Sequence, residues 1–157
     1  MTIKLLAIGK TDNKQLQALI DDYQKRLSHY INFEFEIIPD LKKVKNLSEA
    51  QQKDKEGQLI LSKLNPTDTL ILLDENGKQM HSVAFSEYVQ KYMNSGIKQL
   101  VFVIGGPYGF SEAVYAKAQG KLSLSKMTFS HQMIRLFMVE QLYRAFTILK
   151  NEPYHHR

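Results

Sequence analysis

The stretch LVFVIGGPYGF, from Leu100 to Phe110, decides the fold class that this chain is expected to have. Its first five residues are apolar, as in the buried strands of parallel sheets. The run then stops at two glycines, after which Pro107 fixes one backbone angle and Gly109 permits a left-handed turn. Because a side chain at Gly105 or Gly106 would occupy the space beyond the strand end, the stretch predicts a buried strand followed by a loop that approaches a ligand closely.

Similar apolar runs recur on both sides of this stretch, and sequences with helical periodicity separate them. The further predicted strands are IKLLAIG, FEFEIIP, TLILLD and, more weakly, KLSLS. The predicted helices span about 12–30, 48–64, 82–95, 111–119 and 132–150, with Asp12 capping the first and Gly96 closing the third. This alternation predicts one α/β domain over residues 1–157, with a mostly parallel sheet and helices on both faces.

The composition excludes several classes of protein. No cysteine occurs, which rules out a disulfide framework and cysteine-based metal sites. No segment approaches the roughly 20 apolar residues of a membrane span, and the N-terminal apolar run is too short for a signal peptide. The sequence thus predicts a cytoplasmic protein with no metal and no membrane partner. The net charge of +5 permits a polyanionic partner without requiring one.

The last predicted helix contains MIRLFMVEQLYRAFTIL, which is apolar on nearly every side. Such a helix must be covered all round, and a sheet in a small domain covers one side only. We therefore predict that a second copy of the chain covers part of the other side, in a homodimer.

The loops after the predicted strands are the places to look for a ligand, because open α/β sheets bind ligands beyond the carboxyl ends of their strands. Taken alone, DENG at 74–77 is a tight turn and SLSKMTFSHQ at 123–132 caps a helix. Together with GGPYG at 105–109 they supply backbone groups and small side chains suited to a purine or an amino-acid moiety. The dinucleotide and nucleoside triphosphate fingerprints are both missing, which argues against those enzyme classes.

Five motifs in order, LLDENG, FVIGGPYG, SLSKMTFSHQ, EQLYRAFTIL and NEPYHH, closely resemble the bacterial ribosomal large subunit methyltransferase H family of the SPOUT superfamily. The resemblance implies a deep trefoil knot in the C-terminal part, a homodimer, S-adenosylmethionine as methyl donor, and methylation at N3 of a pseudouridine in 23S rRNA. Members of this family commonly carry proline before the motif histidine, where this chain has Ser130, so we expect a looser entry into the last helix. The donor-contacting residues carried over by motif are Leu73, Gly105, Leu124, Ser125, Lys126, Met127, Thr128 and Phe129.

Methylation at N3 requires the imide to lose its proton, and histidine titrates near neutrality. His155 is the first candidate for the base and His131 the second, since each lies in a matched motif. Their structural alternatives are a disordered tail and a helix cap.

The same motifs contain candidates for holding RNA. Arg135 and Arg144 are predicted to clamp phosphates, and Tyr154 to stack on an unpaired base, with Arg157 as a further tail contact. Alternatively, the two arginines pair with Glu140 or with a neighbouring chain. Because the tail is polar, removing residues 154–157 is expected to change stability little.

The function predicted from these residues is methylation of 23S rRNA within the assembled ribosome or large subunit, since a small chain offers little surface of its own for a long RNA. Two alternatives stay open at this stage. One is a non-enzymatic ribosome-binding or RNA-binding factor of the same fold, and the other is a tRNA methyltransferase.

Overall fold

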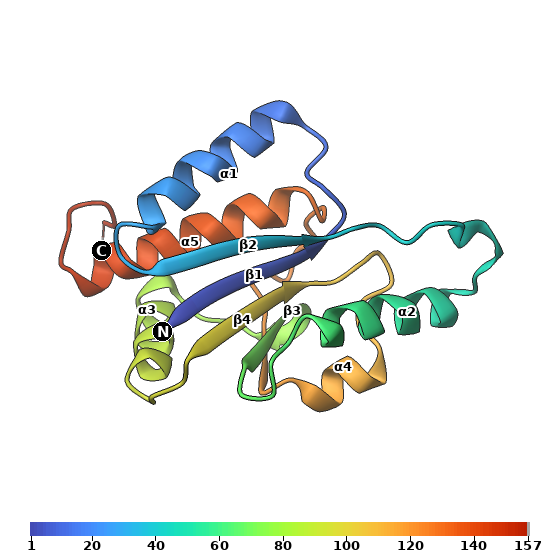
Figure 1. Cartoon of the computed structure of the whole chain (residues 1–157). Helices are drawn as coiled ribbons and strands as arrows, with labels where there is room; N and C mark the ends of the chain where they lie inside the picture. The colour runs from blue at the N-terminus through green and yellow to red at the C-terminus, as the bar shows by residue number, and fades with distance from the viewer. Residues whose placement is uncertain (157) are drawn as a thin grey trace.

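The computed structural model describes residues 1–156, and its centre is a five-stranded sheet in the order β2-β1-β4-β3-β5 (Figure 1). Every ladder in this sheet is parallel, which confirms the predicted sheet type. Apolar sequence explains the middle of the sheet, where β1 and β4 are buried on both faces. The strands are β1 (Thr2–Ile8), β2 (Asn32–Ile38), β3 (Thr69–Lys78), β4 (Gln99–Ile104) and β5 (Gly120–Leu122).

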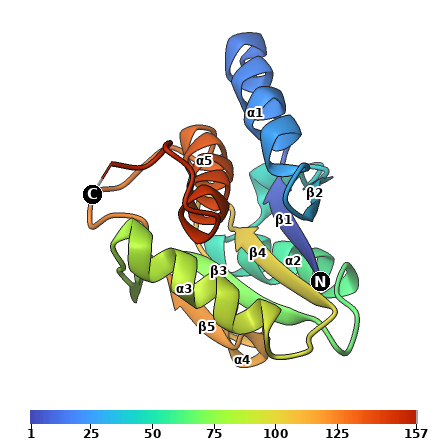
Figure 2. The ribbon, with the colours of Figure 1, turned by 90° about the vertical axis from the view of Figure 1, so that its left-hand side faces the viewer.

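Helices cover both faces of the sheet, as predicted, and form two layers around it (Figures 1 and 2). The layer on one face consists of α1, α3 and α5, and the layer on the other consists of α2 and α4. Strand side chains alternate between these layers, so that Leu5 packs in the first core and Leu6 in the second. The helices are α1 (Lys14–Leu27), α2 (Glu49–Ser62), α3 (Ser82–Met93), α4 (Glu112–Lys117) and α5 (Met133–Leu149).

Local sequence signals set most helix boundaries. Ser48 and Gln51 form a capping box at the start of α2, and Gly96 closes the turn after α3 with a φ of +81°. The predicted cap at Asp12 is wrong. Asn13 caps α1 instead, because its Oδ1 accepts hydrogen bonds from the backbone N–H groups of Gln15 and Leu16 at 2.8 and 3.0 Å.

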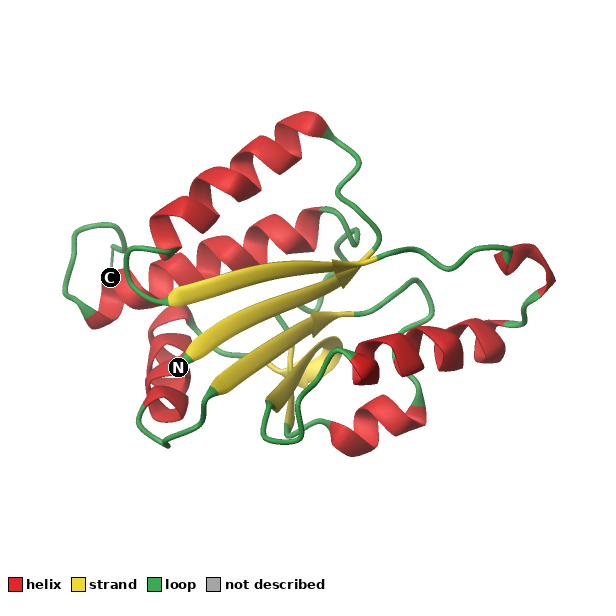
Figure 3. Ribbon diagram, in the orientation of Figure 1, coloured by secondary structure: helices red, strands yellow, loops and turns green. Residues whose placement is uncertain are grey.

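The segment between β2 and α2 runs well away from the sheet before it returns (Figure 3). It contains the short 3₁₀ helix η1 (Val44–Asn46) and the exposed side chains of Lys42, Lys43 and Lys45. Its return brings the second half of α2 back against the sheet, where Ile60 is buried.

The apolar α5 is covered largely by its own chain. The helix lies between α1 and α3 and against the sheet, in one continuous core (Figure 2). The expectation that only the sheet covers it is therefore wrong, because two neighbouring helices pack on its flanks. Met133 and Phe137, near its N-terminus, remain 41% and 37% exposed.

Candidate active site

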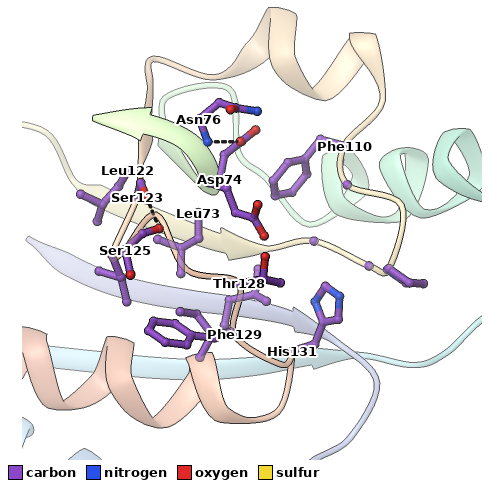
Figure 4. A pocket seen from close by; sticks show the side chains of 18 of the residues that line it. Leu73, Asp74, Asn76, Phe110, Leu122, Ser123, Ser125, Thr128, Phe129 and His131 are labelled. Atoms are coloured by element: carbon purple, nitrogen blue, oxygen red, sulfur yellow. Dashed lines mark hydrogen bonds between the residues drawn. The ribbon is translucent and has the colours of Figure 1, made fainter. Parts of the chain in front are cut away.

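A cavity of about 360 Å³ lies at the carboxyl edge of the sheet (Figure 4). The strand register creates it, because Leu73 of β3 pairs with Ile104 on one side and with Leu122 on the other, and these two partners are the last residues of β4 and β5. The loops that follow these strands form its walls. Its lining residues are Leu73–Asn76, Ile104–Pro107, Gly109, Phe110, Tyr115, Leu122–Ser125, Met127–Phe129, His131 and Ile134.

The glycine loop after β4 turns as the sequence predicts. The backbone N–H of Gly109 donates to the carbonyl oxygen of Gly106 at 3.2 Å, and Gly109 has a φ of +80°. A non-glycine residue would be strained at that angle. Pro107 lies inside this turn, where its restricted φ favours the bend.

The paired glycines also pack closely against protein neighbours. A Cβ at Gly105 would lie 3.1 Å from the ring of Phe110, and a Cβ at Gly106 would lie 2.4 Å from Oε1 of Glu56. At both positions the loop therefore lies against a protein neighbour as well as against the cavity, which both glycines line. Phe110 itself lines the cavity, so Gly105 shapes the cavity through that ring.

The loop from 123 to 129 is held by its own serines. The hydroxyl of Ser123 donates to the carbonyl oxygen of Ser125 at 2.8 Å, and the hydroxyl of Ser125 accepts from the N–H of Met127 at 2.9 Å (Figure 4). Of the donor contacts carried over by motif, Lys126 is the one outside the cavity lining, and its side chain is exposed. The structure gathers the others around the cavity: Leu73, Gly105, Leu124, Ser125, Met127, Thr128 and Phe129.

The chain enters α5 through Ser130, whose hydroxyl accepts a hydrogen bond from the N–H of Met133 at 3.1 Å. This bond satisfies one free N–H at the helix start, whereas Gln132, the N-cap residue of α5, makes no side-chain cap hydrogen bond. The looser entry stays a prediction.

Sequence reasoning missed a carboxylate in the cavity. Oδ1 of Asp74 accepts a hydrogen bond from the N–H of Asn76 at 2.8 Å, and Oδ2 accepts one from the hydroxyl of Tyr115. Burial, together with this bond to Asp74, raises the pKa of Tyr115 to about 12. Residues 74–77 are not an isolated tight turn but continue β3, which is irregular in its pairing with β5 there. The position of Asp74 directly after the apolar run TLILL was the available signal in the sequence.

The two candidate histidines lie far apart. His131 lines the cavity, as Thr128 does (Figure 4). His155 follows α5 at its other end, and the 17 residues of that helix span about 25 Å at 1.5 Å each. Within one chain, the structure thus does not bring His155 to the cavity.

Arg144 of α5 and Tyr154 of the tail gather around Glu140, in a cluster that is separate from the cavity. Oε1 of Glu140 accepts hydrogen bonds from Nε and Nη2 of Arg144 at 3.1 and 2.6 Å, and from the hydroxyl of Tyr154 at 2.9 Å. The hydrogen bonds that Arg144 donates to Glu140 raise the pKa of Arg144, and burial raises the pKa of Tyr154. The alternative pairing of Arg144 with Glu140 is confirmed. A disordered tail is wrong for residues 151–156, and Arg157 lies outside the described residues.

Arg135 lies neither in the cavity lining nor in the cluster around Glu140. The residue is only 1% exposed. Its Nη2 donates to the carbonyl oxygen of Ile8 at 2.9 Å, and its Nε donates to the carbonyl oxygen of His131 at 3.0 Å. Its Nη1 donates to the hydroxyl of Thr11 at 3.2 Å. Burial lowers its pKa. The predictions that Arg135 clamps RNA or pairs with Glu140 are therefore wrong. This side chain ties the start of α5 to the end of β1.

Within residues 1–156, no helix is both long and apolar enough to cross a membrane. The same residues contain no cluster of three or more metal-ligating His, Asp or Glu side chains.

Known proteins similar to this chain share its full length. The protein named ribosomal RNA large subunit methyltransferase H from Flavobacterium johnsoniae is 76% identical over 100% of both chains. The proteins of the same name from Christiangramia forsetii and Parabacteroides distasonis are 73% and 64% identical over 100% and 99% of both chains. The family model described as "Predicted SPOUT methyltransferase" matches residues 1–155. With the motif loops gathered at one cavity, these matches lead to one conclusion: the chain belongs to the SPOUT methyltransferase family.

Proposed function

We propose that this enzyme transfers a methyl group from S-adenosylmethionine to N3 of a pseudouridine in 23S rRNA. The observation that carries the proposal is the cavity at the carboxyl edge of the sheet, where three motif loops meet. The names of the relatives support rRNA as the substrate. Ribosomes are assembled in the bacterial cytoplasm, and a chain without cysteine fits that reducing compartment.

The cavity fits this methyl donor in size and in chemistry. Its 360 Å³ lies within the roughly 300–1,000 Å³ of small-molecule sites. Apolar side chains such as Leu73, Ile104 and Leu122 offer a surface for a purine, and the carboxylates of Asp74 and Glu75 complement a positive charge. When bound, S-adenosylmethionine supplies a methyl group made electrophilic by the sulfonium.

The protein contributes mainly by positioning the reactants. Holding two reactants in line supplies about 7–11 kcal/mol, whereas one general base supplies 10²–10⁴-fold, or about 3–5 kcal/mol. His131 is the base that we propose from within the same chain, because it lines the cavity. Its free ring nitrogen would take the imide proton as N3 takes the methyl group.

We propose a homodimer because the cavity and the cluster around Glu140 lie apart within one chain. If Arg144, Tyr154 and His155 act on the substrate, a second copy must bring them to the cavity, since their own cavity lies at the other end of α5. Two-fold symmetry that pairs α5 helices antiparallel would place the tail of each chain beside the other cavity. The exposed Met133 and Phe137 at the cavity end of α5 are the apolar surface available for this contact.

We infer two further properties from the family. One is that the C-terminal part forms a deep trefoil knot, which the packing of loop 123–129 beside loop 105–109 at one cavity supports. The other is that recognition requires the assembled ribosome or large subunit, because the small chain offers little surface for a long RNA. Efficient methylation of protein-free 23S rRNA would contradict the second inference.

The substrate is tested by mass spectrometry of 23S rRNA fragments from a deletion strain and its complemented parent. We expect the deletion to remove one methyl mass from a pseudouridine-containing fragment. An unchanged 23S rRNA with a methyl lost from tRNA would favour a tRNA methyltransferase. No change in either RNA, with no saturable uptake of S-adenosylmethionine in calorimetry, would favour a non-enzymatic ribosome-binding factor.

The dimeric site is tested by mixing two variants at a donor concentration where each has little activity, one with the cavity narrowed by Gly105→Val and one lacking residues 154–157. If the tail acts across the dimer, random reassortment makes about half the dimers mixed, each with one intact site, and restores about a quarter of the parental activity. If each chain uses its own tail, the mixture keeps that low activity. Each variant alone, at the same total concentration, is the control.

A further inference from the structure

The carboxyl group of Glu56, on α2, is a buried ionisable group with an unpaired oxygen atom. The residue is only 4% exposed, and its Oε1 has no hydrogen-bond partner in the described structure. Burial raises its pKa, and the carboxylate of Asp40 adds to this effect. Buried polar atoms are nearly always paired, so an unpaired one calls for an explanation.

Glu56 lies directly behind the glycine loop of the cavity. A Cβ at Gly106 would fall 2.4 and 2.6 Å from the two carboxyl oxygens, which shows how closely the carboxyl packs against that backbone. Gly106 lines the cavity, whereas Glu56 does not. The carboxyl therefore supports the loop from the side away from the ligand space.

The next residue of α2 makes a similar close approach farther along the same segment. A Cβ at Gly57 would lie 2.3 Å from the hydroxyl of Ser111, which caps α4 through the N–H of Val114 at 3.3 Å. Two consecutive residues of α2 thus fit against both ends of the segment from 106 to 111. Phe110, between these ends, packs against Gly105 and lines the cavity.

We propose that Glu56 is a positioning residue for the methyl-donor loop: its carboxyl is the support that holds Gly105–Gly109 in the shape that binds S-adenosylmethionine. The inference rests on the proposed function of the cavity. The role belongs to the shape of the group rather than to its charge, because a buried carboxyl with an unpaired oxygen is less unfavourable when neutral. Glutamine, which is neutral and of nearly the same shape, is expected to replace it.

The first test measures the affinity for S-adenosylmethionine by calorimetry on the full chain, with the thermal midpoint measured alongside. We expect Glu56→Ala to weaken binding by about tenfold or more at a temperature where the variant is folded, and Glu56→Gln to bind like the parent. Glu36→Ala is the matched control, because Oε2 of Glu36 is also buried without a partner but lies on β2. This control is expected to lower the thermal midpoint without weakening binding.

A second test does not depend on how well Glu56→Ala folds by itself. Gly106→Ala is expected to weaken binding because its methyl group collides with the carboxyl of Glu56. In the double variant with Glu56→Ala, the vacated space accommodates that methyl group, so the two losses combine to less than their sum. Additive losses would overturn the proposal.

The outcomes separate this inference from the proposed function. Binding by the parent chain with equal affinity in Glu56→Ala would overturn the role of Glu56 and leave the methyltransferase proposal intact. Equal weakening in Glu56→Gln and Glu56→Ala would also overturn it, since the charge would then be the required property. Absence of binding by the parent chain would overturn the proposed function itself.

Discussion

Nη1 of Arg144 lies 3.0 Å from Nδ1 of His155. Because a guanidinium only donates hydrogen bonds, Nδ1 of His155 is the acceptor, and the proton of the neutral ring is on Nε2. Held in this way, the ring has no free lone pair for a substrate proton. Among residues 1–156, no hydrogen bond occupies either ring nitrogen of His131. For this reason we propose His131 ahead of His155 as the base.

The first prediction compares the two histidines. His131→Ala is expected to lower the methylation rate by roughly 10²–10⁴ with donor affinity nearly unchanged, and higher pH is expected to recover part of the loss by ionising the imide without help. His155→Ala is expected to lose less in rate and to show no recovery with pH. Single-turnover methylation of ribosomes across a pH series measures both. The opposite ranking would restore His155 as the base.

The second prediction concerns the stability of the tail. Tyr154→Phe removes a hydroxyl that donates to Glu140 and accepts from the hydroxyl of Tyr23 at 3.2 Å. We expect the free energy of unfolding to fall by about 1–3 kcal/mol, contrary to the expectation of a weakly held tail. Urea denaturation measures the change. Tyr108→Phe, at a side chain that is 44% exposed, is the control and should leave stability within about 0.5 kcal/mol.

The third prediction concerns alkaline pH. Burial and the bond to Asp74 raise the pKa of Tyr115 to about 12, whereas an unfolded tyrosine titrates near 10. Between these values the folded chain binds more protons than the unfolded chain, so stability falls as pH rises through this window, and it is fully retained below about pH 10. Denaturation midpoints from pH 9 to 12 should fall less steeply in Tyr115→Phe than in the parent. Parallel curves would show that Tyr115 does not hold its proton in the fold.

The fourth prediction concerns Arg135 as a structural tether. Arg135→Ala leaves the carbonyl oxygens of Ile8 and His131 without a charged donor, and we expect unfolding to become about 3 kcal/mol easier. The salt dependence of ribosome binding should keep the parental slope, because a buried guanidinium contacts no phosphate. Lys150→Ala, at the exposed end of α5, is the stability control. A shallower salt slope would return Arg135 to the RNA-binding surface.

The fifth prediction concerns Gly105 and its ring contact. Gly105→Val should push the ring of Phe110 into the cavity, weakening S-adenosylmethionine binding by about tenfold or more and lowering stability by about 1–3 kcal/mol. Gly96→Val is the matched control at the amino end of β4. Its φ of +81° makes a side chain strained there, so stability should fall while donor affinity stays parental.

Local patterns in the sequence were sufficient for most of the framework. Apolar runs such as Leu100–Ile104 predicted buried parallel strands, and the observed sheet contains them. Ser48 and Gly96 marked helix ends correctly, because capping depends on a few neighbouring residues. The same local logic was wrong at Asp12, where a neighbouring residue with equal capping ability made the bonds.

The sequence by itself determined the parallel α/β sheet, the ligand loops at its carboxyl edge and, through five ordered motifs, the family. Tertiary structure alone decided that Arg135 is buried, that Glu56 lies behind Gly106, and that His131 and His155 lie at opposite ends of α5. The physical reason is the separation along the chain between the residues that interact. Strand period, turns and caps depend on residues a few positions apart, whereas these three relationships depend on how separate elements pack, and motif order carries no distance.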